Sequence, residues 1–248
     1  EEQYRALAAK AIEEIYSERS NDLEKMNAYI YLSMLHQLEG NQLKASEIFD
    51  YVTTHFSQEL ANDSDGYRKL IIFDNGESRI EFYKKLQKTN RVIVTFDSIY
   101  MEWDGPSFAF KLLSRQDNLD IIAIRKREKQ TYQQDLTREN FMNVLEKLVN
   151  CYEEKMSYGF SLGAYNSLYF ASLLNCRILA ISPRLSIHPI YGRTKIIPKY
   201  DFKQNISLPN NESISPIIVF DPKNKLDNRY VHKEVIKAFP NSILIKVP

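Results

Sequence analysis

The sequence is poor in glycine and cysteine and has no long apolar run. Of its 248 residues, 7 are glycine and 2 are cysteine. Two cysteines are too few for a disulfide framework, so buried free thiols are expected at Cys151 and Cys176. No metal-ligand spacing, membrane span or signal peptide is visible. These absences favour a cytoplasmic protein that holds no metal and no bound cofactor.

The charges are balanced. There are 33 basic and 32 acidic residues, for a net charge of +1. Such a chain has no overall field that would attract nucleic acid or an anionic membrane. The length allows one α/β domain with a small appendage. The sequence begins with Glu-Glu and ends within a strand-like run at Val247-Pro248, which favours an excerpt from a longer protein.

Residues 1–62 carry apolar side chains at helical spacing. Helices are expected over the first 15 or so residues, over 23–38 and over 43–56, with a stop at Gly40-Asn41. The helical hairpin resembles one tetratricopeptide-type unit, which would offer a groove for a protein partner; plain helical packing is the alternative. One such unit cannot bury itself, so either further repeats precede it or it packs on the next domain. A polar, turn-rich stretch at 61–66 marks the boundary.

Residues 63–248 change to short strands that alternate with helices. Two leading strands followed by alternating units predict an α/β fold with a mostly parallel sheet of eight strands and helices on both faces. The strands are expected at 69–73, 79–86, 91–96, 119–124, up to 160, 177–181, 216–220 and 242–247. The helices are expected from 106, over 138–152, from 162 and over 228–239.

The most informative motif is Gly159-Phe-Ser161-Leu-Gly163. It lies between a predicted strand and a predicted helix, the context of a nucleophile elbow. Such a turn holds the serine in a strained backbone conformation, and side chains at the two glycine positions would collide with neighbouring backbone. The alternative is a tight turn with an inert serine.

An acyl-transfer serine needs donors for the oxyanion that forms on the carbonyl. The N–H of Leu162, at the helix start, is one candidate. The second donor is expected from the loop after the third strand, where the candidates are Phe96, Asp97 and Ser98.

The acid and the base should follow Ser161 in that order. Asp227 stands a few residues after the seventh strand and is preferred to Asp221 at the strand end; a helix N-cap and a turn are their structural alternatives. The base should follow the eighth strand, so we expect it beyond Pro248. A displaced base, His232 before His188, and an inactive site are the alternatives.

Two groups of side chains are candidates for substrate binding. Trp103 lies in the acidic loop after the third strand, where it either lines a polar substrate mouth or packs at a helix entrance. Arg125 and Arg127 follow the fourth strand. They either pair with Asp97 or Asp104, hold an anionic substrate, or belong to a solvated loop.

The long segment 184–215 is expected to form a lid. It is basic and rich in tyrosine, which suits a carbohydrate or an anionic polymer better than an acyl chain. His188 is its candidate substrate contact. The other polar residues that we assign to it are Tyr191, Arg193, Lys195, Lys199, Tyr200 and Lys203.

Four segments together resemble a bacterial branch of the α/β-hydrolase superfamily that is associated with surface-polysaccharide synthesis and includes capsule O-acetyltransferases. They are residues 158–165, 180–183, 94–97 and 220–227. The resemblance implies Ser161 as nucleophile, Asp227 as acid and an acyl-serine intermediate.

The expected function is therefore acetyl transfer to a bacterial surface polysaccharide or its precursor, with acetyl-CoA as donor. A carbohydrate esterase, in which water resolves the same intermediate, is the first alternative. A catalytically inactive scaffold module is the second.

Overall fold

The computed structural model describes residues 2–127, 132–192, 202–207 and 213–247. The chain begins with helices that are capped by asparagine side chains. Asn21 forms a reciprocal capping box with Glu24, and Asn41 accepts from the Lys44 N–H at 3.2 Å. These helices are α1 (Glu2–Tyr16), α2 (Asp22–Leu38), α3 (Gln42–His55) and α4 (Ser57–Asn62).

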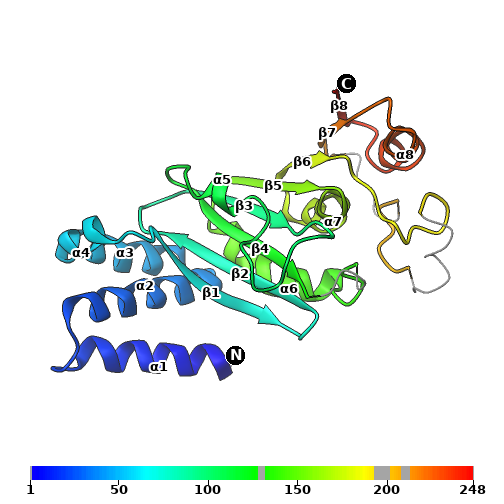
Figure 1. The fold of residues 1–248 in the computed structure, drawn as a ribbon. Helices are drawn as coiled ribbons and strands as arrows, with labels where there is room; N and C mark the ends of the chain where they lie inside the picture. Colours follow the sequence, from blue (N-terminus) through cyan, green and yellow to red (C-terminus); the bar gives the residue numbers. More distant parts are fainter. Residues whose placement is uncertain (1, 128–131, 193–201, 208–212, 248) are drawn as a thin grey trace.

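A single sheet of eight strands follows, in the order β1-β2-β4-β3-β5-β6-β7-β8 (Figure 1). The β1–β2 and β2–β4 pairs are antiparallel and all other pairs are parallel. The strands are β1 (Tyr67–Asp74), β2 (Ser78–Lys85), β3 (Arg91–Phe96), β4 (Asp120–Lys126), β5 (Glu154–Phe160), β6 (Arg177–Ile181), β7 (Ile217–Phe220) and β8 (Ile243–Lys246). The predicted mostly parallel sheet is confirmed, with each strand within a few residues of its expected place.

The first helices of this part are α5 (Phe110–Leu113), α6 (Arg138–Asn150) and α7 (Leu162–Phe170), which continues into the 3₁₀ turn η1 (Ala171–Leu174). A last helix follows β7 and consists of α8 (Lys225–Tyr230), the π-helical turn η3 (Val231–Val235) and α9 (Ile236–Ala238). Thr137 caps α6 through the Asn140 N–H, as expected. The last helix starts three residues earlier than predicted, because Asn224 accepts from the N–H groups of Leu226 and Asp227.

The two faces of the sheet bury different amounts of apolar surface. Along β3, Val92, Val94 and Phe96 point to one face, where side chains of α2, α6, α7 and the last helix form the larger core. Ile93 points to the other face, which a smaller cluster with Leu113 of α5 covers. Helices therefore lie on both faces, as predicted.

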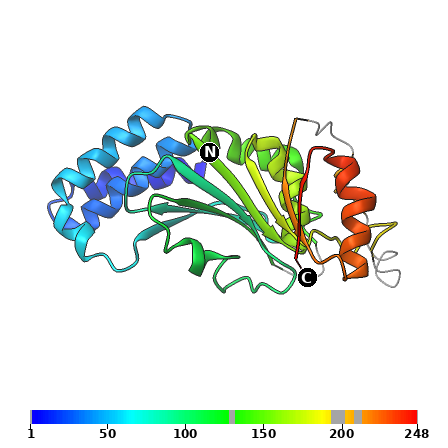
Figure 2. The same ribbon diagram turned by 90° about the horizontal axis from the view of Figure 1, so that it is seen from above.

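The N-terminal helices pack on the sheet and share its larger core. They lie at one end of the sheet, and the last helix lies at the other (Figure 2). Polar contacts join the two parts. The Tyr4 hydroxyl donates to the Ile72 carbonyl, and Arg68 Nε donates to Asn27 Oδ1 at 2.7 Å. Of the two arrangements expected for the helical hairpin, the structure shows packing on the next segment.

Both cysteines are free and half-buried rather than fully buried. Within the described ranges, no helix is long and apolar enough to cross a membrane.

Candidate active site

Ser161 stands in a sharp turn between β5 and α7. Its φ of 54° and ψ of −114° are strained for a residue with a side chain. A Cβ at Gly159 would lie 2.2 Å from the Gly163 oxygen, and a Cβ at Gly163 would lie 2.3 Å from the Phe96 oxygen. Because neither glycine has a side chain, the backbone of the turn packs closely on itself and on the end of β3. This geometry holds the Ser161 side chain at the carboxyl edge of the sheet.

The backbone around Ser161 is fixed by its neighbours. Its N–H donates to the Ile181 carbonyl at 2.9 Å, and its own carbonyl accepts from Tyr165 at 3.1 Å and from Arg184 at 3.3 Å. The helix therefore begins at once with Leu162, whose N–H is one of the groups that a first helical turn leaves without an intrahelical acceptor. The position matches one half of an oxyanion hole.

The three candidates for the second donor differ in their surroundings. The Asp97 N–H donates to the Ile124 carbonyl at 3.0 Å, so it is already used. Phe96 is paired within the sheet, opposite both Ile124 and Gly159. Ser98 lines the cleft that contains Ser161. Ser98 is the candidate whose placement fits the second donor.

A cleft of about 230 Å³ opens beside Ser161. Ser161, Arg184 and four tyrosines give it a polar, aromatic lining, and no carboxylate side chain is on its surface among the described residues. The residues of the lining are Ser98, Ile99, Tyr100, Tyr132, Phe160, Ser161, Arg184, Leu185, Ser186, Tyr191, Gly192, Leu226 and Tyr230.

The two candidate acids have different environments. Asp227, in α8, is 2% exposed. Its Oδ1 lies 3.4 Å from Arg184 Nη1 but has no hydrogen-bond partner within the described residues. Asp221 instead accepts from the Lys223 N–H at 2.7 Å in a turn. A buried carboxylate oxygen next to the cleft is what an imidazole N–H would need, so the geometry favours Asp227. Asn224, and not Asp227, is the helix cap.

The four histidines all lie off the cleft lining. His36 lies 3.6 Å from Glu39 in α2, and His55 contacts the Tyr51 carbonyl at 3.0 Å in α3. His232, the fallback base, is exposed on η3 with its ring 5.7 Å from that of Phe220. The fallback is therefore not brought to Ser161.

His188 has both ring nitrogens occupied. Nδ1 accepts from the N–H groups of Ile190 and Tyr191 at 3.2 and 3.1 Å, and Nε2 lies 2.9 Å from Glu234. The ring stacks on Tyr191 and meets Tyr230 edge-on, and both tyrosines line the cleft. His188 thus supports the cleft wall from beneath, at 5% exposure, and is not placed to contact a substrate.

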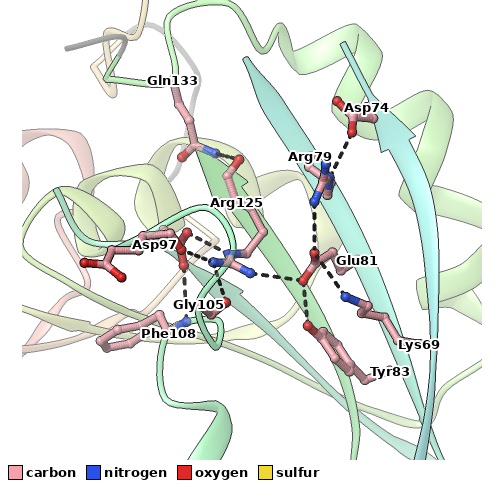
Figure 3. A network of polar contacts seen from close by, with 11 residues as sticks. Lys69, Asp74, Arg79, Glu81, Tyr83, Asp97, Gly105, Phe108, Arg125 and Gln133 are labelled. Atoms are coloured by element: carbon pink, nitrogen blue, oxygen red, sulfur yellow. Dashed lines mark hydrogen bonds and ion pairs between the residues drawn. The ribbon is translucent and has the colours of Figure 1, made fainter. Parts of the chain in front are cut away.

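Arg125 is buried in β4, at 2% exposure, and not in a loop after it. Its Nε donates to Asp97 Oδ2 at 2.8 Å and its Nη1 to Glu81 at 3.2 Å (Figure 3). Its Nη2 donates to the carbonyls of Glu102 and Gly105 at 2.6 and 3.0 Å. Burial acts to lower the pKa of Arg125, but the charges of Asp97 and Glu81 raise it. The guanidinium holds the loop that begins at Ser98, and none of it reaches a substrate.

The remaining candidate contacts lie on the β2 side of this loop. The Trp103 ring packs under Arg79, whose Cζ is 4.1 Å from the ring centre. Arg127 is exposed and donates to the Gly76 carbonyl at 3.2 Å in the β1–β2 turn. Neither lines the Ser161 cleft. Trp103 therefore packs against another side chain, which was the alternative to a substrate contact. Tyr100, from the same loop, is the aromatic residue that lines the cleft.

Several cleft residues were not singled out as site residues from the sequence. Arg184, Tyr132 and Tyr230 come from three separate loops or helices, so no local motif joins them. One indication of Arg184 is present in the sequence, because this residue directly follows the segment 180–183, which spans the end of β6. Of the predicted lid, the structure places Tyr191 in the cleft wall. Arg193, Lys195, Lys199 and Tyr200 lie outside the described residues.

No protein-family model matches this sequence. No curated protein matches it either. Solved structures do match. An esterase from Pyrococcus furiosus is 11% identical with a TM-score of 0.50, over 77% of this chain and 83% of that one. Est1E from Butyrivibrio proteoclasticus is 13% identical with a TM-score of 0.45, over 73% and 88% of the two chains.

The capsule O-acetyltransferase of Neisseria meningitidis serogroup A is 15% identical with a TM-score of 0.45, over 75% of this chain and 88% of that one. At 11% identity, the match to the esterase from Pyrococcus furiosus bears on the fold alone. The predicted fold class, an eight-stranded, mostly parallel sheet of the α/β-hydrolase type, is confirmed.

Proposed function

We propose that this chain is a serine acyl-transfer enzyme that acetylates a hydroxyl of a bacterial surface polysaccharide or its precursor. One observation carries the proposal. Ser161 is held at a φ of 54° at the carboxyl edge of the sheet, at the start of α7 and in a cleft that Ser98 also lines. A strained serine at a helix start, beside a loop that can supply a second backbone donor, is the arrangement that nucleophilic acyl transfer needs.

The chemistry follows from that geometry. Ser161 Oγ attacks the acyl carbonyl and gives its proton to a base. The N–H groups of Leu162 and Ser98 stabilise the oxyanion, and its collapse breaks the C–S bond of acetyl-CoA and expels the thiolate of coenzyme A, which takes up the proton from the base. A sugar hydroxyl then gives its proton to the base and attacks the acyl-serine, and the departing Ser161 oxygen takes that proton back. With water as acceptor, the same steps give a carbohydrate esterase.

Asp227 is the acid of this proposal, and the carboxyl end of β8 is the place where its base is expected. The strands β5 to β8 are parallel, so their carboxyl ends lie at one edge. The Val247 N–H donates to the Phe220 carbonyl at 3.0 Å, which keeps the end of β8 beside the end of β7. A residue that follows β8 thus enters the edge where Ser161 and Asp227 lie.

The choice of acceptor rests on the cleft and on the sequence resemblance. A tyrosine ring can pack on the apolar face of a sugar, and the tyrosine hydroxyl can form a hydrogen bond with a sugar hydroxyl. A cytoplasmic location, where acetyl-CoA is available, completes the proposal. The outer faces of the N-terminal helices, with Leu43 at 74% and Tyr16 at 83% exposure, are where a protein partner of the tetratricopeptide-like segment would bind.

A fluorophosphonate probe tests the nucleophile. The protein should be labelled, Ser161→Ala should abolish the labelling, and Ser186→Ala should keep it, because Ser186 lines the same cleft without the strained backbone. An unlabelled wild-type protein would favour the inactive scaffold. His232→Ala should label at the wild-type rate, whereas a large loss would make His232 the base.

A donor assay separates transfer from hydrolysis. We expect acetyl-CoA to be consumed only when a glycan acceptor is present. Steady release of acetate into water, with no effect of the glycan, would support the esterase instead.

A further inference from the structure

The last part of the chain carries the excess positive charge of the molecule. Residues 177–248 contain 12 basic and 5 acidic residues, whereas residues 1–176 contain 21 basic and 27 acidic residues. The nearly neutral total therefore results from two regions of opposite net charge. A region with a local excess of one sign attracts a partner of the other sign, even when the whole chain is close to neutral.

Four of these cations form a row along the last helix. They recur at every fourth residue and all are exposed: Lys225, Arg229, Lys233 and Lys237. Four residues slightly exceed an α-helical turn of about 3.6 residues, so such a row drifts around the helix, but the π-helical turn η3 in its middle takes more residues per turn and reduces the drift. The row is roughly 18 Å long at a rise of 1.5 Å per residue. We call these four residues the basic row.

Within the described residues, no ion pair neutralises the basic row. The two acids of the last helix are buried and paired elsewhere. Asp227 is 2% exposed and lies 3.4 Å from Arg184, and Glu234 is 3% exposed and lies 2.9 Å from His188. Asp221, before the helix, accepts a backbone N–H in a turn. The row therefore presents its charge to solvent, at the end of the molecule opposite to the N-terminal helices (Figure 2).

The basic row lies beside the mouth of the Ser161 cleft. The Arg229 guanidinium carbon is 5.4 Å from the centre of the Tyr191 ring, and Tyr191 lines the cleft. Leu226, at the start of the same helix, also lines the cleft and is 52% exposed. Among the described residues, the lining contains one cation, Arg184, and no carboxylate. A negatively charged ligand on the row thus meets no like charge in the cleft lining.

We propose that the basic row is the docking surface for an acidic polysaccharide, a glycan whose repeating units carry negative charge. The proposal rests on the proposed acyl transfer, because it makes this polymer the acceptor that leads into the Ser161 cleft. The row is longer than a single sugar unit, so an oligomer engages all four cations and a monosaccharide cannot. Each exposed contact is weak alone, and the affinity comes from several contacts made by one chain.

Two other kinds of polyanion fit the basic row less well. Single-stranded nucleic acid needs aromatic rings on which its bases stack, but the aromatic side chains of the last helix, Tyr230 and Phe239, are buried. An anionic membrane needs an apolar helix face that can insert, whereas Val231 and Val235 are buried in the core of the protein. A chain of charged, hydroxyl-rich sugars needs neither feature.

Calorimetry and ligand-observed NMR on the whole chain test the row with oligogalacturonate, in which each sugar carries a carboxylate, and with neutral dextran of similar length. Only oligogalacturonate should bind, and its affinity should fall as salt is added. Replacing all four cations of the row by glutamine should weaken binding by about tenfold or more. The matched control makes the same change in net charge at four exposed cations elsewhere, and it should bind like the wild type. Its four positions are Lys10, Lys111, Arg115 and Lys147.

A labelling arm tests the link to the Ser161 cleft. Bound oligogalacturonate should slow fluorophosphonate labelling of the wild-type protein and should have no effect on the row variant, which without ligand should be labelled at the wild-type rate. Binding that leaves the labelling rate unchanged would overturn the docking of an acceptor at this cleft. A protein that binds oligogalacturonate through the row but is never labelled would overturn the acyl transfer alone.

The binding arm decides the proposal by itself. If the fourfold variant does not fold, Lys233→Gln combined with Lys237→Gln should weaken binding by about threefold. The proposal is overturned if oligogalacturonate does not bind at millimolar concentration, if dextran binds as well, or if the row variant binds as tightly as the wild type. It is also overturned if oligothymidylate or phosphatidylserine vesicles bind through the row more tightly than oligogalacturonate.

Discussion

Two buried aspartates, Asp120 and Asp227, lie at opposite ends of the parallel strands and have different sets of partners. At the amino end, the Asp120 carboxylate accepts from three donors and ties α2 and α6 to the sheet through Tyr152 and Gln37. At the carboxyl end, Asp227 is as deeply buried, yet its Oδ1 has no hydrogen bond within the described residues. Asp120, with three hydrogen bonds, holds structure together, whereas Asp227 has an ion pair with Arg184 at 3.4 Å and an Oδ1 that can still accept a hydrogen bond from a further group.

The same contrast exists between two arginines at the carboxyl end. Arg125 donates to two carboxylates and two carbonyls, so it positions the loop after β3. Arg184 lines the cleft at 33% side-chain exposure, and within the described part of the chain its one ion pair is to Asp227 at 3.4 Å. Sequence position suggested a substrate contact for Arg125, but the number of partners makes Arg184 the better candidate.

The largest effect should come from the carboxyl end. Asp227→Asn removes the charge that would orient and stabilise an imidazolium, so the rate of fluorophosphonate labelling should fall by about 10⁴-fold. Asp221→Asn is the matched control and should stay within about twofold, because Asp221 only closes a turn. Equal rates for the two variants would remove Asp227 from the triad.

Arg125→Met tests the loop clamp. It leaves Asp97 buried without its cation and removes one of the cations of Glu81, which keeps Arg79 and Lys69, so the free energy of unfolding in denaturant should fall by about 3–5 kcal/mol. The labelling rate of the folded protein should also fall, because the loop that carries Ser98 loses its two carbonyl anchors. Arg127 is exposed and lies two residues further along the chain. Arg127→Met should therefore change neither the free energy of unfolding nor the labelling rate appreciably.

Lys84→Met is the counterpart at the amino end. Asp120 would lose its cation while fully buried, so a similar loss of about 3–5 kcal/mol is expected. The labelling rate at Ser161 should not change for the folded protein, since no residue of that network lines the Ser161 cleft. A slower rate in Lys84→Met would show that the two ends are coupled.

The sequence predicted what depends on local pattern. The strands with alternating or continuous apolar residues, the Thr137 cap and the glycines around Ser161 all follow from short-range chemistry, and the structure confirms them. The preference for Asp227 over Asp221 also came from position along the chain, and its burial supports that preference.

The rest depended on contacts between segments far apart in the chain. Arg125 looks like a loop cation in the sequence, because nothing local shows that Glu81, 44 residues earlier, lies beside it. Trp103 packs under Arg79 for the same reason. The Gln37–Tyr152 contact joins residues that are 115 apart, so no motif could have indicated it.

The smallest expected effect is a loss of stability in alkali. Burial raises the pKa of Tyr152 at the amino end, and of Tyr165 and Tyr230 at the carboxyl end, well above that of a free phenol. Because the folded pKa values are raised, the contribution is complete below about pH 10, the pKa of an unfolded tyrosine, and is lost as the pH rises above it. Phenolate absorbance and circular dichroism should therefore change together.

Replacing one of these tyrosines with phenylalanine shows which end of the sheet causes the loss of stability in alkali. Tyr230→Phe keeps the ring contacts with Tyr165 and His188, and it removes one group that must ionise, so the alkaline transition should move to higher pH. Tyr152→Phe also removes one ionising group but takes a hydrogen bond from Asp120, so its stability at neutral pH should fall. Phenolate absorbance that rises fully before the circular dichroism changes would mean that these rings ionise within the folded protein, against their burial.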